Sequence, residues 1–217
     1  MSIDKQDLLL YAVTDRTWMG ESTLAAQAKE AIEAGVTMIQ LREKNLDYGR
    51  FFELAMAVRR VTERSQIPFV INDNVDVALA CGADGIHVGQ KDQPADEVRR
   101  QIGPGKILGV SVQTVQQAIC AEQSGADYLG VGAMFLTSTK QDASKVSFET
   151  LKTICGTVNI PVVAIGGIGK NNILKLGGSG IAGVAVVSAI FAQPDISAAA
   201  AELRRLAETM AEGQGGR

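Results

Sequence analysis

Charged and amide side chains gather in one short segment, QLREK at residues 40–44, directly after an apolar run. Side chains alternate between two faces along an extended strand, so we expect Gln40, Arg42 and Lys44 on one face and Leu41 on the other. Two cations and an amide on one face are suited to clamp a diphosphate. Taken alone, the segment fits equally well a solvated strand end in which Glu43 pairs with Arg42 or Lys44.

Two carboxylates follow the next two apolar runs. Asp73 comes after the run Phe69 to Ile71, and Asp92 follows the run Gly85 to Val88. Mg²⁺ in proteins is usually bound by one or two carboxylates, with water and phosphate oxygens in its other positions. For either residue alone a structural role is the more common one, Asp73 as the N-cap of a helix starting at Val75 and Asp92 as a turn residue. Their joint occurrence beside a cationic segment favours a magnesium site.

Glycines and a hydroxyl follow the last two apolar runs. Gly166 and Gly167 come directly after Val162 to Ile165, and Ser188 comes after Gly183 to Val187. Backbone amides exposed by glycines, together with a helix N-terminus after the eighth strand, form the usual phosphate site of barrel enzymes. Glycines also serve tight corners of a barrel, so the pair is informative mainly through its position. Together with the cationic segment at residues 40–44, these glycines and Ser188 predict two anion-binding sites and therefore two phosphorylated substrates.

A long polar loop, residues 132–147, carries the segment TSTK at 137–140. Its hydroxyls and Lys140 could close over a bound phosphate, and the alternative is an ordinary surface loop. A loop of this length inside a compact domain is more often functional.

The histidine and the cysteines give little evidence of a catalytic role. His87 is the single histidine and lies inside an apolar run, so we interpret it as packed and hydrogen-bonded rather than catalytic. Cys81, Cys120 and Cys155 are widely spaced in apolar, helix-like contexts, which suits buried thiols in a reducing compartment. No GxSxG, CxxC or HExxH motif occurs, which argues against a hydrolase nucleophile or a zinc site.

Alternating elements must position these residues. Short β-rich runs alternate with amphipathic segments such as residues 22–34, 48–64 and 115–124, the pattern of a parallel sheet with crossover helices. About eight strands are expected, at Leu8 to Thr14, Thr37 to Arg42, Phe69 to Ile71, Gly85 to Val88, Ile107 to Val110, Tyr128 to Val131, Val162 to Ile165 and Gly183 to Val187. Similar turns at residues 34–36, 81–84 and 124–127 put a glycine just past a helix, where a left-handed residue caps it. We expect an α/β fold, a (β/α)₈ TIM barrel, with an open doubly wound sheet as the main alternative.

The composition of the chain indicates which classes of partner it is not suited to bind. The 217 residues, 46% of them hydrophobic, suit one domain over residues 1–217, with 213–217 as a frayed tail. A net charge of −3, a pI near 5.3 and no basic cluster argue against nucleic acid. No secretory leader and no apolar run of membrane-spanning length are seen, so we expect a cytoplasmic protein without a membrane partner. The sequence leaves open whether the protein forms a homo-oligomer.

Taken together in chain order, seven segments resemble the thiamine phosphate synthase family over nearly the whole chain. They are QLREK (40–44), IND (71–73), DGIHVGQKD (84–92), GVS (109–111), TSTK (137–140), AIGGI (164–168) and VVSAI (186–190). The resemblance implies a (β/α)₈ barrel that joins 4-amino-2-methyl-5-(diphosphooxymethyl)pyrimidine to a thiazole phosphate. The products would be thiamine phosphate and diphosphate.

The resemblance also implies roles for individual residues. It assigns Mg²⁺ as cofactor to Asp73 and Asp92. It assigns the pyrimidine diphosphate to Gln40, Leu41, Arg42, Glu43, Lys44, Asn72, Ser111 and Lys140, with Arg42, Lys44, Ser111 and Lys140 as catalytic residues. It assigns the thiazole phosphate to Thr137, Ser138, Thr139, Gly167, Val187 and Ser188. The implied mechanism is dissociative and carbocation-like, and it needs no protein nucleophile.

Three alternatives compete with this function. A paralogous thiazole tautomerase would isomerise the thiazole without joining it, and the retained clamp and carboxylates argue against it. A non-catalytic sensor of phosphate ligands on the same scaffold would need no carboxylate pair. Phosphate-binding barrels of tryptophan biosynthesis or sugar-phosphate epimerisation share the site after strands seven and eight, but they do not explain the cationic segment.

Overall fold

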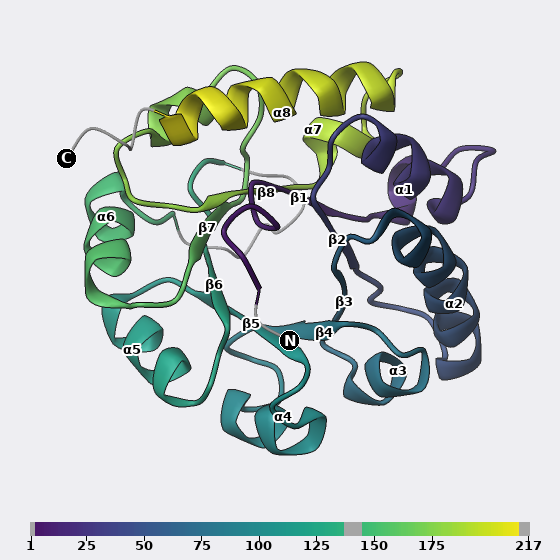
Figure 1. Cartoon of the computed structure of the whole chain (residues 1–217), viewed down its shortest axis with the longest axis horizontal. Helices are drawn as coiled ribbons and strands as arrows, with labels where there is room; N and C mark the ends of the chain where they lie inside the picture. Colours follow the sequence, from purple (N-terminus) through teal and green to yellow (C-terminus); the bar gives the residue numbers. More distant parts are fainter. Residues whose placement is uncertain (1–2, 137–144, 213–217) are drawn as a thin grey trace.

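The computed structural model describes residues 3–136 and 145–212. In them, eight parallel strands close into a barrel in which each strand pairs with the next and β8 pairs with β1. The strands are β1 (Leu10–Val13), β2 (Met38–Leu41), β3 (Phe69–Asn72), β4 (Gly85–Val88), β5 (Ile107–Val112), β6 (Tyr128–Val131), β7 (Val162–Ile165) and β8 (Gly183–Val186). Figure 1 shows them as an inner ring enclosed by helices. The expected (β/α)₈ barrel is confirmed, and the open sheet is excluded.

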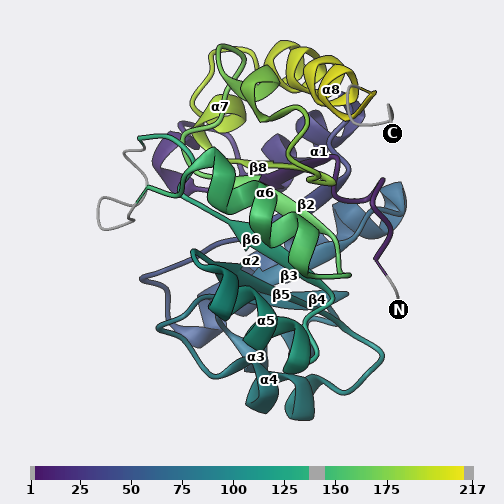
Figure 2. The same ribbon diagram turned by 90° about the vertical axis from the view of Figure 1, so that its left-hand side faces the viewer.

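Helices cover the outside of the ring between successive strands. They are α1 (Leu24–Glu33), α2 (Tyr48–Ser65), α3 (Val75–Ala80), α4 (Ala95–Ile102), α5 (Val115–Gln123), α6 (Phe148–Thr157), α7 (Ser188–Phe191) and α8 (Ile196–Glu212), with 3₁₀ turns η1 (Arg16–Trp18) and η2 (Ile173–Leu176). The crossover after β7 contains only η2. Figure 2 places α7 and α8 on the opposite side of the barrel from α3 and α4. Within the described ranges, no helix has the length and hydrophobicity needed to cross a membrane.

The apolar residues form two layers because strand side chains alternate. The larger layer lies between strands and helices and includes Ile39 and Leu41. The smaller layer fills the barrel interior with Leu8, Tyr11, Val13, Met38, Val70, Ile107, Tyr128, Val163 and Ala185. Ile3, which precedes β1, packs against the interior layer from the amino-terminal side. The interior is therefore a packed core at this end, whereas a cavity is lined by residues at the carboxyl ends of the strands.

Side-chain caps fix where the crossover helices begin. Thr23, Asp47, Asn74, Thr114 and Ser147 each accept a hydrogen bond from the backbone N–H three residues further on. Such caps satisfy amides that the first helical turn leaves without partners. The cap of α3 is Asn74, so the alternative in which Asp73 caps this helix is wrong.

The glycine turns after the helices are confirmed. Gly35, Gly82 and Gly125 follow α1, α3 and α5 with φ of 109°, 69° and 87°, a region that favours residues without a Cβ. Of the three free cysteines, Cys81 is buried, Cys155 is half-buried and Cys120 is exposed. The prediction of a buried thiol is therefore wrong for Cys120, because its side chain lies on the solvent face of α5.

Candidate active site

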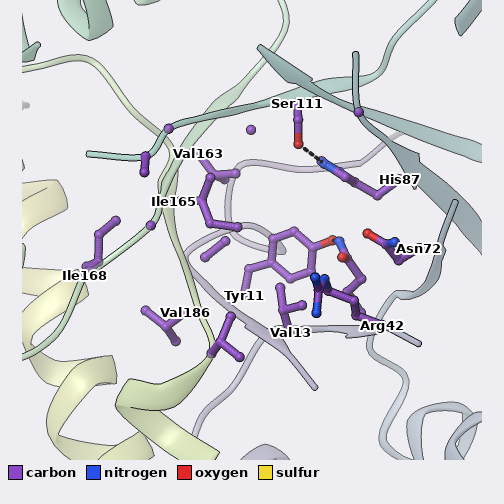
Figure 3. A pocket seen from close by; sticks show the side chains of 18 of the residues that line it. Tyr11, Val13, Arg42, Asn72, His87, Ser111, Val163, Ile165, Ile168 and Val186 are labelled. Atoms are coloured by element: carbon purple, nitrogen blue, oxygen red, sulfur yellow. Dashed lines mark hydrogen bonds between the residues drawn. The ribbon is translucent and has the colours of Figure 1, made fainter. Parts of the chain in front are cut away.

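A cavity of about 460 Å³ opens among the carboxyl ends of the strands. Its polar wall comes from β2 to β5 and the loops after them, with Gln40, Arg42, Lys44, Asn72, His87, Gln90, Lys91, Asp92, Ser111 and Gln113. Its apolar wall comes mainly from β1, β7 and β8, with Val13, Val163, Ile165, Ile168, Ala185, Val186 and Val187. Figure 3 shows Arg42, Asn72 and His87 on one side and Ile168 and Val186 on the other. The cavity therefore has a polar half and an apolar half.

The β2 segment delivers three side chains to the polar wall. Gln40, Arg42 and Lys44 all line the cavity, and Leu41 packs in the outer layer, so the predicted alternation is confirmed. Glu43 points elsewhere: its Oε2 accepts a 2.8 Å hydrogen bond from Nε of Arg16. The alternative in which Glu43 neutralises Arg42 or Lys44 is therefore wrong.

Two residues that the resemblance placed at the pyrimidine diphosphate need correction. The side chains of Leu41 and Glu43 do not reach the cavity, because Leu41 is packed under the helices and Glu43 is held by Arg16. Burial raises the pKa of Glu43, and Arg16 opposes that shift. Only the backbone at these two positions could contact a ligand. Arg42, by contrast, has no carboxylate partner within the described part of the chain.

Asn72 ends β3 with an unsatisfied donor. Its side chain is 7% exposed, and its Nδ2 is buried with no hydrogen-bond partner among the described residues. A buried amide without a partner is destabilising, so such groups in native proteins usually have a function. Since Asn72 lines the cavity, its amide is placed to donate to an acceptor on a ligand.

The two predicted metal-ligating carboxylates meet beside the β2 cations. Asp73 Oδ2 lies 3.2 Å from Lys44 Nζ, and Asp92 Oδ2 accepts a 2.7 Å hydrogen bond from the backbone N–H of Gly89. Asp92 therefore stabilises its own turn, which is the structural role predicted as an alternative from the sequence. Burial first, and then a side-chain hydrogen bond and the charge of the neighbouring Asp92, raise the pKa of Asp73.

This pair fits a hard divalent cation. Two adjacent carboxylates gain stability from a cation between them, and Mg²⁺ needs no more than two protein carboxylates when a phosphate supplies further oxygens. No group of three or more His, Cys, Asp or Glu side chains that could hold a metal ion occurs in the described ranges. The residues present therefore suit a site completed by water and ligand oxygens, and not a closed all-protein site.

His87 lies at the boundary between core and cavity. It is 6% exposed, with Nδ1 2.9 Å from the hydroxyl of Tyr128 and Nε2 2.8 Å from Oγ of Ser111. The packed, hydrogen-bonded histidine that we predicted is confirmed, although the ring also lines the cavity. Tyr11 and Tyr128, which complete its surroundings, were missed, because a tyrosine in a strand run is an ordinary β-forming residue.

The residues predicted to bind a phosphate after β7 and β8 also line the cavity. Gly166, Gly167, Val187 and Ser188 line the cavity, and α7 begins at Ser188. Gly166 and Gly167 have φ of 95° and 66°, and a Cβ on Gly167 would overlap the carbonyl of Leu136. Glycine is thus required here, because the backbone itself forms the wall.

Asn172 was missed by sequence reasoning and holds this glycine turn. Its Nδ2 donates to the carbonyl of Gly167 at 2.9 Å, and its Oδ1 accepts from the N–H of Gly169 at 2.9 Å. An asparagine that closes a turn on both sides leaves no sequence signature beyond its proximity to the glycines. Thr137, Ser138, Thr139 and Lys140, which the resemblance assigns to the two ligands, lie outside the described residues.

Comparisons with known proteins agree with this geometry. Residues 10–190 match the family model described as thiamine monophosphate synthase. A thiamine-phosphate synthase of Clostridium tetani is 51% identical over 91% of this chain and 94% of its own length. That of Ruminiclostridium cellulolyticum is 51% identical over 92% and 95%, respectively. The solved structure of a thiamine phosphate pyrophosphorylase from Pyrococcus furiosus superposes with a TM-score of 0.88 at 39% identity, covering 95% of this chain and 98% of that one.

Proposed function

Because the chain belongs to the thiamine monophosphate synthase family, we propose that it joins 4-amino-2-methyl-5-(diphosphooxymethyl)pyrimidine to a thiazole phosphate with the help of Mg²⁺. Membership makes the chain an enzyme, a transferase that forms thiamine phosphate. The substrates, the metal and the mechanism are the parts that we propose. The observation that carries them is the convergence of Arg42, Lys44 and the Asp73 and Asp92 pair at one mouth of the barrel.

The polar wall suits the pyrimidine diphosphate. Arg42 and Lys44 offer positive charge, and Asn72 offers an amide donor that is otherwise without a partner. A diphosphate presents several anionic oxygens, and charge-assisted hydrogen bonds to such oxygens are about twice as strong as neutral ones. Gln40 and Ser111 add further polar atoms to the same wall. Lys140 is expected from the sequence to join this set.

The reaction needs only charge stabilisation and alignment. The bond between the methylene carbon and the diphosphate oxygen breaks, and both electrons leave with diphosphate. The aminopyrimidine ring stabilises the resulting methylene cation, and the lone pair of the thiazole ring nitrogen then forms the new C–N bond. Arg42 and Lys44 neutralise charge that develops on the leaving diphosphate, an effect that preorganised groups supply efficiently inside a cavity.

A magnesium ion would be held by Asp73 and Asp92. When bound, it would neutralise further negative charge on the diphosphate. Lys44 contacts Asp73 at 3.2 Å, so it keeps that carboxylate oriented toward the same ligand. A bound cation would also offset the like charges of the two neighbouring carboxylates.

The opposite wall suits the thiazole phosphate. The glycine turn after β7 and Ser188 after β8 present backbone amides and a hydroxyl at the position where barrels commonly bind phosphate. Val163, Ile165 and Val186 offer an apolar surface on which a neutral thiazole ring can pack. Thr137, Ser138 and Thr139 are expected from the sequence to contribute further donors.

One assay tests the proposal. Purified protein is given both substrates, and thiamine phosphate and diphosphate are measured with time. We expect the two products in equal amounts, loss of activity with EDTA, and recovery when excess Mg²⁺ is added. Isomerisation of the thiazole without diphosphate release would show a tautomerase instead, and unchanged activity in EDTA would remove the metal from the proposal.

Variants of the carboxylate pair sharpen this test. Asp73→Asn and Asp92→Asn keep the side-chain shape but remove negative charge, so turnover should fall by about 100-fold or more. Asp96→Asn is the matched control, because Asp96 lies on the exposed surface of α4 and pairs with Arg100. Near-normal turnover in both site variants would contradict the proposed metal role.

A further inference from the structure

Five side chains form a hydrogen-bonded chain across the barrel interior, which we call the tyrosine–histidine chain. Gln40 Nε2 donates to the hydroxyl of Tyr11, and the hydroxyls of Tyr11 and Tyr128 lie 2.9 Å apart. The Tyr128 hydroxyl contacts Nδ1 of His87 at 2.9 Å, and Nε2 of His87 contacts Oγ of Ser111 at 2.8 Å. The last of these contacts is drawn in Figure 3.

The direction of this chain follows from its first member. The Gln40 amide nitrogen can only donate, so Tyr11 accepts there and has its own proton to give to Tyr128. Tyr128 then donates to Nδ1 of His87, which leaves the ring proton on Nε2, directed at Ser111. In this direction each hydroxyl and imidazole proton of these side chains has an acceptor within the chain, except the proton of the Ser111 hydroxyl, and Ser111 lines the cavity.

The opposite direction is unfavourable. If His87 donated from Nδ1 to Tyr128, and Tyr128 donated to Tyr11, then Tyr11 would accept twice and its own proton would have no acceptor. Tyr11 is 1% exposed, and a buried donor without an acceptor is destabilising. Burial raises the pKa of both Tyr11 and Tyr128, so both phenols stay protonated and can take part as donors.

We propose that His87 is a positioning residue: the chain holds it as the neutral Nε2–H tautomer, so that Ser111 accepts from His87 and presents its own proton to the bound pyrimidine diphosphate. This rests on the proposed function for the identity of the ligand. A serine hydroxyl alone can rotate to donate or accept. The bond from His87 uses one of the two lone pairs of Ser111 Oγ and leaves its O–H to point at the ligand, which suits an oxygen or a ring nitrogen there.

The barrel makes room for this arrangement with glycines. In the strand register, Gly109 lies opposite both His87 and Tyr128. A Cβ on Gly109 would overlap the Tyr128 ring and His87 Nδ1. A Cβ on Gly130 would lie 3.2 Å from His87 Cε1 and 3.9 Å from Ser111 Oγ. Position 109 therefore needs to be glycine for the imidazole to fit between Tyr128 and Ser111, and a side chain at position 130 would crowd the ring.

The tautomer can be measured without substrate. His87 is the single histidine in the chain, so uniform ¹⁵N-histidine labelling gives one pair of ring nitrogen signals. Long-range ¹H–¹⁵N correlation of the wild-type protein should show a protonated Nε2 and an unprotonated Nδ1. An Nδ1–H tautomer or an imidazolium near neutral pH would overturn the proposal. This result does not depend on whether the protein forms thiamine phosphate, so it separates failure of the inference from failure of the proposed function.

A pair of variants tests the effect on catalysis. His87→Gln can place an amide N–H near the position of Nε2 and keep the donor to Ser111, whereas His87→Asn reaches only toward the position of Nδ1. We expect kcat to fall about tenfold more in His87→Asn than in His87→Gln, the effect of one lost hydrogen bond. Equal losses in the two variants would mean that His87 only fills space.

Tyr128→Phe removes the donor to Nδ1, so the ring signals should move toward a mixture of tautomers and kcat should fall about tenfold. Ser179→Ala is the matched control, because it also removes a buried hydroxyl, one that donates to the carbonyl of Leu176 away from the cavity. Ser179→Ala should leave both the histidine signals and kcat unchanged. Unchanged ring signals in Tyr128→Phe would contradict the proposed direction of the chain.

Discussion

Asn72 is buried in a way that does not favour stability. It is the last residue of β3, it is buried in the polar wall, and its amide nitrogen has no hydrogen-bond partner among the described residues. An apolar side chain of similar size would avoid this unsatisfied donor. The residue is better explained by a ligand that accepts from it, and the nearby Arg42 and Lys44 indicate that this ligand is anionic.

Replacing this donor by an acceptor should weaken binding without unfolding the protein. Asn72→Asp keeps the shape of the side chain but places a negative charge against the diphosphate. We expect KM for the pyrimidine diphosphate to rise roughly 10-fold to 100-fold, which corresponds to about 1.5–3 kcal/mol for a hydrogen bond to a charged group. Steady-state kinetics give the change in KM, and thermal unfolding checks that the variant is folded.

Asn159→Asp is the matched control for this substitution, because it makes the same chemical change at an exposed position before β7. It should leave KM unaltered. A normal KM in Asn72→Asp would show that the amide of Asn72 does not contact the diphosphate.

At the scale of elements, arginines fasten the turns that lead into the strands. Arg99 on α4 donates to the carbonyls of Gly125, Gly103 and Lys106 at 2.7–3.0 Å and to Oδ2 of Asp127 at 2.5 Å. The same Asp127 oxygen accepts from the N–H of Leu108 at 2.7 Å. One guanidinium thus joins the end of α4, the start of β5 and the turn before β6.

Related contacts recur around the barrel. Arg59 on α2 donates to Asp84, which in turn accepts from the N–H of Phe69, and Arg204 on α8 donates to the carbonyl of Gly35. In each case a helix is joined to the glycine turn of a neighbouring βα unit. Because these turns set where each strand starts, they also determine which residues reach the cavity at its other end.

Arg99→Lys tests the importance of this geometry. Lysine keeps the charge but lacks the planar fork of five donors, so several carbonyls would lose their partner. We expect a loss of about 2–3 kcal/mol in the free energy of unfolding, measured by urea denaturation, with KM for both substrates unchanged. Arg100→Lys on the same helix is the control: its side chain is 71% exposed, and its effect should stay within about 0.5 kcal/mol. Equal effects in the two variants would refute a special role for Arg99.

Two elements, β2 and α3, show which local features could be predicted from the sequence. The alternation along β2 correctly separated Gln40, Arg42 and Lys44 from Leu41, because the side-chain period of a strand is two residues whatever surrounds it. The cap of α3 was not predicted correctly, because the sequence reasoning considered Asp73 in that role and Asn74 occupies it. The choice depends on a tertiary contact: the backbone N–H of Asp73 donates to the carbonyl of His87 on β4, which extends the ladder by one residue.

Contacts between distant segments were beyond the sequence pattern. The hydroxyls of Tyr11 and Tyr128 meet across 117 residues of chain, and Glu43 pairs with Arg16 across 27. Neither contact follows from local spacing, because both depend on how the closed barrel brings β1 against other elements. The general position of the site could be predicted, whereas the hydrogen bonds that orient its side chains could not.

At the scale of the whole molecule, closure of the barrel gives one cavity a polar wall and an apolar wall. The strands β2 to β5 contribute its charged and amide side chains, while β1, β7 and β8 contribute mostly apolar side chains and the glycine turn. Under the proposed function each substrate would be held by its own wall, and the reacting atoms would meet between the walls. Such an arrangement would need no protein nucleophile, because alignment of two reactants can supply a large part of the rate enhancement.

The divided cavity predicts that the polar wall binds diphosphate by itself. Inorganic diphosphate with Mg²⁺, at about 100 times its Kd, should stabilise the folded protein by about 2.7 kcal/mol. For a domain of this size that corresponds to a rise in Tm of roughly 5–10 °C, which differential scanning calorimetry can measure. Diphosphate with EDTA should give a smaller rise, because Arg42, Lys44 and Asn72 remain but the cation is gone.

Asp73→Asn separates the two contributions to this rise. It should remove most of the increment that Mg²⁺ adds while keeping the increment seen in EDTA, whereas the exposed Asp96→Asn should behave as the wild-type protein. If diphosphate raised Tm equally with and without Mg²⁺ in the wild-type protein, the carboxylate pair would not be a metal site. If diphosphate gave no rise under either condition, the polar wall would not be the diphosphate site, and the proposed division of the cavity would fail with it.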